Sequence, residues 1–393
     1  MNSTRLFSRF YRFFVQLFNF RVHKRSFSML PRYDVVMVGT YEDMLEPDMI
    51  PVRYGNPTSG SLPGPDFTFN HLVGNIRLLQ VTAPDLLTLQ GREHAREKFY
   101  RTVEWAVRNG TRVILLTEGI KHLFGEYGYE LKSRFPGIVF TTGESSLTWA
   151  LAQEVFNSLQ YYALRPQSSR IAVIGATGIP GEAVVRTLVR EGYFRTVGVG
   201  RRGSRLSHLA HEYGIEIRGG LDELSGIDAL VLCRSHPEWR LTGALVSRLR
   251  RPDRRLLVLD AAEPPGFPWE EYQTSRNVVV RQDAGRLFSP NMRFVLNFIT
   301  TRMMGLHSGV VSARLAEAIA LAHYFDKNIQ VHQYDWFQVT EQQHQFVGAL
   351  LQSLGFFVPA PLCFGKPVQI PSLFLEQTSY PAHGHLESSP ASS

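Results

Sequence analysis

The sequence has few cysteines, no long apolar run and no visible internal repeat. Cys233 and Cys363 are the only cysteines among 393 residues, which fits a reducing cytosol and gives no disulfide framework. The histidines show no metal-ligand spacing, so no metal site is expected. No stretch of roughly 18 apolar residues occurs, so no membrane span is predicted. The composition, 44% hydrophobic and 20% charged, is that of a cytoplasmic globular protein long enough for two domains.

Acidic residues are missing from the first part of the chain. The formal net charge is +7, and the sequence after residue 32 is close to neutral, so nucleic acid is not an expected partner. The basic residues of that first part are Arg5, Arg9, Arg12, Arg21, Lys24, Arg25 and Arg32.

Residues 1–31 form a basic extension with aromatic and leucine side chains at roughly helical spacing. Such a segment can contact an anionic membrane surface. It can also be a docked or disordered extension, or a transit peptide. The apolar core of a secretory signal is absent, because Arg and Gln interrupt it.

The pattern after residue 32 alternates between short apolar strands and amphipathic helices. It predicts an N-terminal α/β domain at 32–165 that binds substrate. Its expected strands are 33–40, 112–117 and 138–142, its expected helices are 93–109 and 147–159, and 41–65 is expected to be a loop.

The second half predicts a doubly wound parallel sheet, a Rossmann domain, at 166–285. It is followed by C-terminal helices at 286–363 that complete the active-site cleft, and by a flexible tail at 364–393. The expected strands are 171–174, 196–200, 228–233, 256–260 and 277–281, and the expected helices are 182–191, 206–213, 311–323 and 341–354.

A glycine-rich loop lies between a buried strand and a helix, and it reads Gly175, Ala176, Thr177, Gly178, Ile179, Pro180 and Gly181. Gly175 allows the tight turn, Gly178 lets the backbone approach a diphosphate, and Gly181 permits close packing. The helix N-terminus then offers free N–H groups to the phosphates. This context, more than the glycines alone, predicts a dinucleotide site.

The end of the next strand distinguishes the two nicotinamide cofactors. NAD enzymes usually place an acidic residue there, whereas this chain has Arg201, Arg202 and Arg205. Guanidinium groups suit a 2′-phosphate, so the sequence predicts NADP(H). A solvated basic turn is the alternative.

The chain resembles the long-chain acyl-[acyl-carrier-protein] reductases of the cyanobacterial alkane pathway. The resemblance spans roughly residues 33–360 and implies NADPH-dependent reduction of a fatty acyl thioester to a fatty aldehyde, an activity of lipid metabolism, with acyl carrier protein as a partner. Four segments carry it: 140–143 with Thr148 and Trp149, the loop 173–181, Ala313–Ala318 (ARLAEA, where the family has ACFAEA), and Gly355–Phe356.

One departure concerns the nucleophile. The resemblance implies a cysteine where this chain has Arg314, and a guanidinium has no lone pair with which to attack a thioester. Three interpretations stay open. The protein reduces an acyl-derived or other carbonyl directly, with Arg314 polarising the carbonyl or holding a carboxylate or phosphate. Another group such as Cys233 replaces the nucleophile, or the protein binds NADP or an acyl chain without catalysis and serves a regulatory or partner-binding role.

Two further residues are predicted near the substrate. Thr142 either lines the substrate cavity or caps the following helix. Glu317 shares a helix face with Arg314, so it either forms a local ion pair or contacts substrate. Asp260 and Cys233 end sheet strands; a loop-capping role and a buried apolar role are favoured for them.

Overall fold

The computed structural model describes residues 33–40, 61–125, 127–233, 240–294, 301, 306–368 and 372–373. The predicted basic extension 1–31 lies outside the described residues, as does most of the predicted tail. None of the described helices is long and apolar enough to cross a membrane. Contact of residues 1–31 with a membrane surface therefore stays a prediction.

The N-terminal sheet has six strands in the order β13-β2-β3-β1-β4-β5. Strands β3, β1, β4 and β5 run parallel to one another. At one edge β2 pairs antiparallel with β3, and β13 pairs antiparallel with β2. This confirms an α/β arrangement here. The strands are β1 Val35–Thr40, β2 Ser61–Phe69, β3 Leu72–Leu79, β4 Val113–Leu116, β5 Val139–Thr141 and β13 Met292–Phe294.

The β2–β3 hairpin corrects the predicted loop, because β2 already begins at Ser61. Pro63 and Pro65 hide this strand in the sequence, since proline is unfavourable inside a sheet. The structure accommodates them where the pairing register shifts between Pro63 and Asp66, a bulge that relieves the ladder locally.

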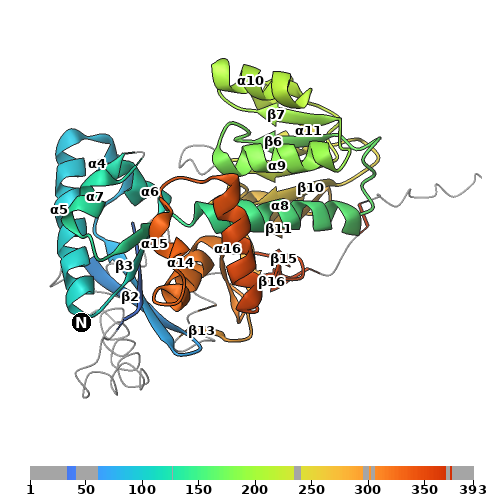
Figure 1. Cartoon of the computed structure of the whole chain (residues 1–393). Helices are drawn as coiled ribbons and strands as arrows, with labels where there is room; N and C mark the ends of the chain where they lie inside the picture. The colour runs from blue at the N-terminus through green and yellow to red at the C-terminus, as the bar shows by residue number, and fades with distance from the viewer. Residues whose placement is uncertain are drawn as a thin grey trace, which may run out of the picture.

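One face of this sheet packs against α5. This helix begins four residues before its predicted start, because the Thr88 hydroxyl caps it by accepting from the N–H of Gly91. The other face packs against α14, and Figure 1 shows these two helices on opposite sides of the sheet. The helices of this half are α4 Ala83–Leu87, α5 Leu89–Arg108, α6 Glu118–Lys121, α7 Tyr129–Arg134 and α8 Glu144–Tyr161.

The second sheet is fully parallel, in the order β11-β10-β9-β6-β7-β8. Numbered from β6, this is 6-5-4-1-2-3, the strand order of the Rossmann fold. The predicted doubly wound sheet is confirmed, with β8 as a strand that the sequence did not reveal. The strands are β6 Ile171–Ile174, β7 Thr196–Val199, β8 Glu216–Arg218, β9 Ala229–Leu232, β10 Leu256–Asp260 and β11 Val279–Asp283.

Helices cover both faces of this sheet. One face packs against α8, α9 and α10, and the other against α11 and α12. Helix α8 belongs to both halves, because Leu147 and Ala150 lie in the N-terminal core and Leu151 and Val155 in the second. The remaining helices are α9 Ile179–Arg190, α10 Ser204–Tyr213, α11 Gly243–Leu249 and α12 Trp269–Ser275.

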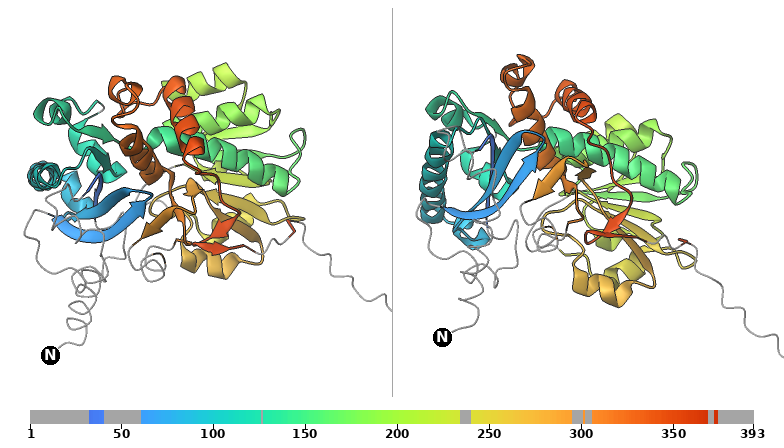
Figure 2. Two further views of the ribbon diagram at one scale, coloured as in Figure 1. Left: turned by 60° about the horizontal axis from the view of Figure 1, so that its bottom comes forward. Right: turned by 90° about the horizontal axis from the view of Figure 1, so that it is seen from below.

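The C-terminal segment is less helical than expected after Gly285. Strand β12 pairs antiparallel with β14, and β13 joins the N-terminal sheet. Strands of three residues leave no periodicity to detect, which explains why the sequence did not predict them. Figure 2 shows α14 and α16 lying against α8 between the two sheets. The elements are β12 Arg286–Phe288, β14 Val310–Ser312, α14 Ala313–Tyr324, α15 Gln330–Gln333, α16 Glu341–Ser353, β15 Leu362–Cys363 and β16 Lys366–Pro367.

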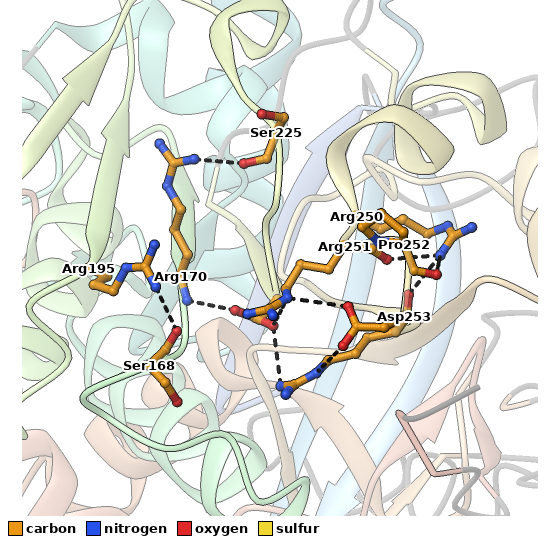
Figure 3. A network of polar contacts seen from close by, with 10 residues as sticks. Ser168, Arg170, Arg195, Ser225, Arg250, Arg251, Pro252 and Asp253 are labelled. Carbon is orange, nitrogen blue, oxygen red and sulfur yellow. Dashed lines mark hydrogen bonds and ion pairs between the residues drawn. The ribbon is translucent and has the colours of Figure 1, made fainter. Parts of the chain in front are cut away.

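An arginine network closes the amino edge of the parallel sheet (Figure 3). At its centre the Asp228 carboxylate accepts from the N–H of Arg170 at 2.8 Å and faces the guanidinium groups of Arg254 at 3.5 Å and Arg251 at 3.9 Å. Only 1% of the Asp228 side chain is exposed. The positive charges of Arg251 and Arg254 therefore compensate the negative charge of a buried carboxylate at the amino edge of the sheet.

We expect Asp228→Asn to lower the free energy of unfolding by about 2 kcal/mol, because two partly buried guanidinium groups lose their shared counter-charge. Urea denaturation of the wild type and the variant measures this loss in the free energy of unfolding. Asp222→Asn is the matched control, since its ion pair with Arg248 is exposed and is worth at most about 1 kcal/mol. Equal losses in the two variants would contradict a structural role for the network.

Candidate cofactor and substrate site

The glycine loop joins β6 to α9 as the sequence predicts. Gly175 has a φ of +81°, and its carbonyl accepts from the N–H of Gly178 at 2.9 Å. A methyl group built on Gly181 would lie 2.2 Å from that carbonyl oxygen. A side chain at position 181 would force the turn open, so glycine is required here.

The helix that follows offers its N-terminus to the loop. Helix α9 begins at Ile179, with Pro180 in the first turn and no side-chain hydrogen bond at its N-cap, Gly178. Backbone N–H groups at such an end attract anions. Strand β6 lies between β7 and β9, where the strand order reverses, which is where dinucleotides bind in this fold. The predicted loop residues thus have the geometry of a diphosphate site.

Two of the three predicted arginines, Arg201 and Arg202, lie in the turn after β7, next to this loop, and Arg205 lies in the first turn of α10. A methyl group built on Gly200 would approach the Thr177 side chain at 3.4 Å, so the two turns are neighbours. Arg202 pairs with Glu223 at 2.8 Å, and Arg205 lies 3.7 Å from Glu182. Arg201 is exposed. The cluster is basic and accessible beside the loop, and selection of NADP over NAD stays a prediction.

Arg314 lies at the carboxyl edge of the same sheet, in the first turn of α14. Its guanidinium is 3.7 Å from the Glu263 carboxylate, which also accepts from Arg286 at 2.7 Å. Glu263 follows β10, and Arg286 follows β11. The structure therefore brings together two cations and one anion from three separated segments. Sequence patterns indicated Arg314 but not the other two, because Glu263 lies in a loop and Arg286 in the three-residue strand β12, and neither segment carries a motif.

A turn of the backbone fixes where Arg314 lies. Gly143, with a φ of +70°, packs so closely on α14 that a methyl group there would lie 2.4 Å from Cβ of Arg314. The Ser146 hydroxyl donates to the Ala313 carbonyl at 2.5 Å, and the Ala313 N–H donates to the Gly285 carbonyl at 2.9 Å. The backbone N–H and carbonyl of Ala313, the residue before Arg314, are therefore both hydrogen-bonded.

Glu317 is fully buried, and its carboxylate accepts from the Thr141 hydroxyl and, at 2.7 Å, from the N–H of Ser146. These bonds correct the expected local ion pair with Arg314, whose guanidinium faces Glu263. The geometry makes Glu317 a positioning group, and its contact with substrate stays a prediction.

Thr142 is also buried, and its hydroxyl donates to the Trp336 carbonyl at 3.4 Å. The N-cap of α8 is Gly143, with no side-chain hydrogen bond. Thr142 therefore does not cap the helix, which corrects that alternative, and its contact with substrate is a prediction.

A second buried carboxylate, Glu154 on α8, was not predicted. It accepts from the N–H of Gly285 at 2.7 Å and from the Gln282 side chain at 3.3 Å. The signal was available, because Glu154 falls on the same helical face as the core residues Leu147 and Leu151. Burial raises the pKa of Glu154 to about 8 and that of Glu317 to about 7.

The remaining candidates play structural roles. Burial raises the pKa of the Cys233 thiol to about 12, so it stays protonated and is a poor nucleophile. Asp260 accepts from the backbone N–H groups of Ala262, Gly266 and Phe267. The favoured loop-capping role of Asp260 is confirmed.

No family model and no curated protein matches this chain. A dipicolinate synthase chain from Bacillus halodurans is a similar solved structure, with 13% identity, a TM-score of 0.33, and coverage of 64% of this chain and 71% of that chain. The malic enzyme from Pyrococcus horikoshii Ot3 is 15% identical over 84% of each chain, with a TM-score of 0.34. The NAD-dependent malic enzyme from Thermotoga maritima is 11% identical over 84% of this chain and 86% of that chain, with a TM-score of 0.34. Similarity this weak assigns neither an activity nor a substrate to this chain.

Glu154 makes stability dependent on pH. Between its ordinary pKa of 4.5 and its folded pKa of about 8, the folded protein retains a proton that the unfolded chain releases. The free energy of unfolding therefore falls as the pH rises through this range. We expect a shallower fall in Glu154→Gln, measured by urea denaturation at several pH values, with the remaining slope including that of Glu317.

Glu104→Gln is the control for this measurement, since Glu104 forms an exposed ion pair with Arg134. It should follow the wild-type pH dependence. A Glu154→Gln curve parallel to wild type would show that the buried carboxyl group does not titrate as described.

Proposed function

We propose that this protein is an NADP(H)-dependent oxidoreductase, related to acyl-[acyl-carrier-protein] reductases, that reduces an acyl-derived or other carbonyl compound without a covalent thioacyl intermediate. The observation that carries the proposal is the loop from Gly175 to Gly181, with its positive-φ turn and uncapped helix end at the reversal of strand order. Acyl carrier protein is a candidate partner through the family resemblance.

The residues present fit a dinucleotide. The loop and the first N–H groups of α9 would hold the diphosphate, and Arg201 and Arg202 would bind a 2′-phosphate. The bound reduced nicotinamide would supply a hydride. Since a dinucleotide extends to both sides of the strand reversal, its reactive end would lie over β9 and β10, the side on which Glu263 and Arg314 are found.

Arg314 would stabilise negative charge on the carbonyl oxygen of the substrate during this transfer. A guanidinium stays protonated, so it orients and polarises the carbonyl, and the proton that the oxygen takes up comes from water. Neither Arg314 nor the protonated Cys233 thiol supplies a nucleophile for thioester attack, which favours direct reduction of a carbonyl.

The experiment mixes purified protein and NADPH with fatty aldehyde, acyl-CoA or acyl-[acyl-carrier-protein], and follows absorbance of the reduced nicotinamide. We expect turnover with aldehyde and none with the thioesters. A covalent acyl adduct detected by mass spectrometry would contradict the role given to Arg314. Tight NADPH binding without turnover on any carbonyl would instead show a non-catalytic binding protein.

The cofactor preference is tested separately. We expect Arg201→Ala with Arg202→Ala to weaken NADPH binding about tenfold or more and NADH binding far less, because charge-assisted hydrogen bonds to the 2′-phosphate are lost. Calorimetry measures both affinities. Arg190→Ala, at the other end of α9 and exposed, is the control. Equal weakening of NADPH and NADH would reject the assignment of NADP.

A further inference from the structure

Several arginine side chains at the amino edge of the parallel sheet carry a positive charge that no carboxylate compensates within the described residues. The guanidinium groups of Arg165 and Arg276 are exposed, and neither has a hydrogen-bond or ion-pair partner in that part of the chain. Those of Arg195, Arg250 and Arg255 donate to backbone carbonyl oxygens only. We call these five residues the arginine edge.

The five residues follow one another across the sheet. Arg276 precedes β11, Arg255 directly precedes β10, and Arg195 directly precedes β7. Arg250 forms a parallel bridge beside the start of β9, and Arg165 lies in the turn that leads into β6. Since β11, β10, β9, β6 and β7 are neighbours in that order and adjacent strands are about 4.8 Å apart, the arginine edge extends over about 19 Å.

The carboxylates at this edge are paired with other arginines. Arginine nitrogen atoms from outside the arginine edge lie 2.6–3.9 Å from Asp228, Asp253, Glu216 and Glu191. Figure 3 shows Arg195 and Arg250 in the same network as these pairs. Because the chain after residue 32 is close to neutral overall, the uncompensated charge makes the molecule electrically polar. The amino edge therefore attracts anions.

Two exposed aromatic side chains lie at one end of the arginine edge. Phe194 is 70% exposed and Tyr161 is 46% exposed. The turn that contains Phe194 packs on the turn of Arg165, because the hydroxyl of Tyr193 donates to the Leu164 carbonyl at 2.9 Å. A groove of about 550 Å³ opens beside both turns, with an apolar lining from Phe156, Leu164, Pro166 and Tyr193. Exposed aromatic rings beside cations are typical of surfaces that contact a lipid interface.

We propose that the arginine edge binds an anionic phospholipid surface, with its guanidinium groups on the headgroup phosphates and with Phe194 and Tyr161 entering the interface. Guanidinium groups match the geometry of phosphates. Nucleic acid also offers phosphates, but the apolar groove and the exposed Phe194 favour a partner that has hydrocarbon next to its phosphates. The glycine loop follows β6 at the opposite, carboxyl edge of the sheet, so a membrane-bound molecule keeps the proposed cofactor site open to solvent.

The first test is co-sedimentation of the full chain with vesicles of phosphatidylcholine alone, or of phosphatidylcholine and phosphatidylglycerol in equal parts. We expect binding to the anionic vesicles only, and less binding as salt is added. Arg165→Gln with Arg276→Gln should weaken it about tenfold or more, since each basic residue near an anionic surface contributes a factor of about five. Arg92→Gln with Arg108→Gln is the matched control, because both are exposed on α5 and donate only to backbone carbonyls. It should bind as the wild type does.

The second test locates the aromatic contact. Phe194→Ser should weaken binding to the anionic vesicles about tenfold, the lower end of the effect of burying a phenylalanine ring. Phe194→Trp should show more fluorescence quenching than the wild type when the anionic vesicles carry brominated acyl chains, because the new ring enters the interface. Ile329→Ser is the control for the loss of an apolar side chain, since Ile329 is 71% exposed elsewhere on the molecule, and it should leave binding unchanged.

The outcomes separate this surface from other binding sites. Weaker binding in a variant whose midpoint of urea denaturation equals that of the wild type supports the arginine edge, because the fold is then retained. Vesicle binding that neither the double arginine variant nor Phe194→Ser changes would overturn the proposal and assign the contact to another part of the chain. A single-stranded oligonucleotide that binds the protein while anionic vesicles do not would overturn the choice of lipid as the partner.

Discussion

The architecture depends on one buried carboxylate, Glu317, where α14 meets the start of α8. It binds the end of β5 through Thr141 and the first turn of α8 through Ser146. Burying a carboxyl group carries a solvation cost, and the raised pKa of Glu317, about 7, is the sign of that cost. The buried carboxylate in turn fixes the position of Ser146, whose hydroxyl donates to the Ala313 carbonyl immediately before Arg314.

The same logic extends along α8 to the other sheet. Glu154, about three turns from the start of the helix, binds the N–H of Gly285, and the Gly285 carbonyl accepts from Ala313. One helix therefore fixes the ends of both α14 and β11. Its apolar residues divide between two cores, so movement of one sheet relative to the other would have to disrupt packing and buried hydrogen bonds together.

Sequence patterns reveal those parts of the site that are local. The strand from Ile171, the glycine loop and the basic turn at Arg201 follow one another along the chain, so the geometry is set by neighbouring residues. The hairpin β2–β3 was missed because its prolines sit at a bulge. The contact of Glu263 with Arg286 and Arg314 was missed because it joins a loop, strand β12 and helix α14, which are separated in sequence, and only the tertiary structure brings them together.

Arg314 places a positive charge at a nearly buried position beside Gly143. If that position only filled space beside Gly143, an apolar side chain could do so without the cost of desolvating a guanidinium. The protein instead places there a nearly buried cation, backed by a fixed backbone and facing a carboxylate shared with a second arginine. A thiol would have supplied a covalent bond to the substrate; a guanidinium supplies charge and direction. The chemistry that suits such a group is the binding of an oxyanion or the stabilisation of developing negative charge on a carbonyl oxygen.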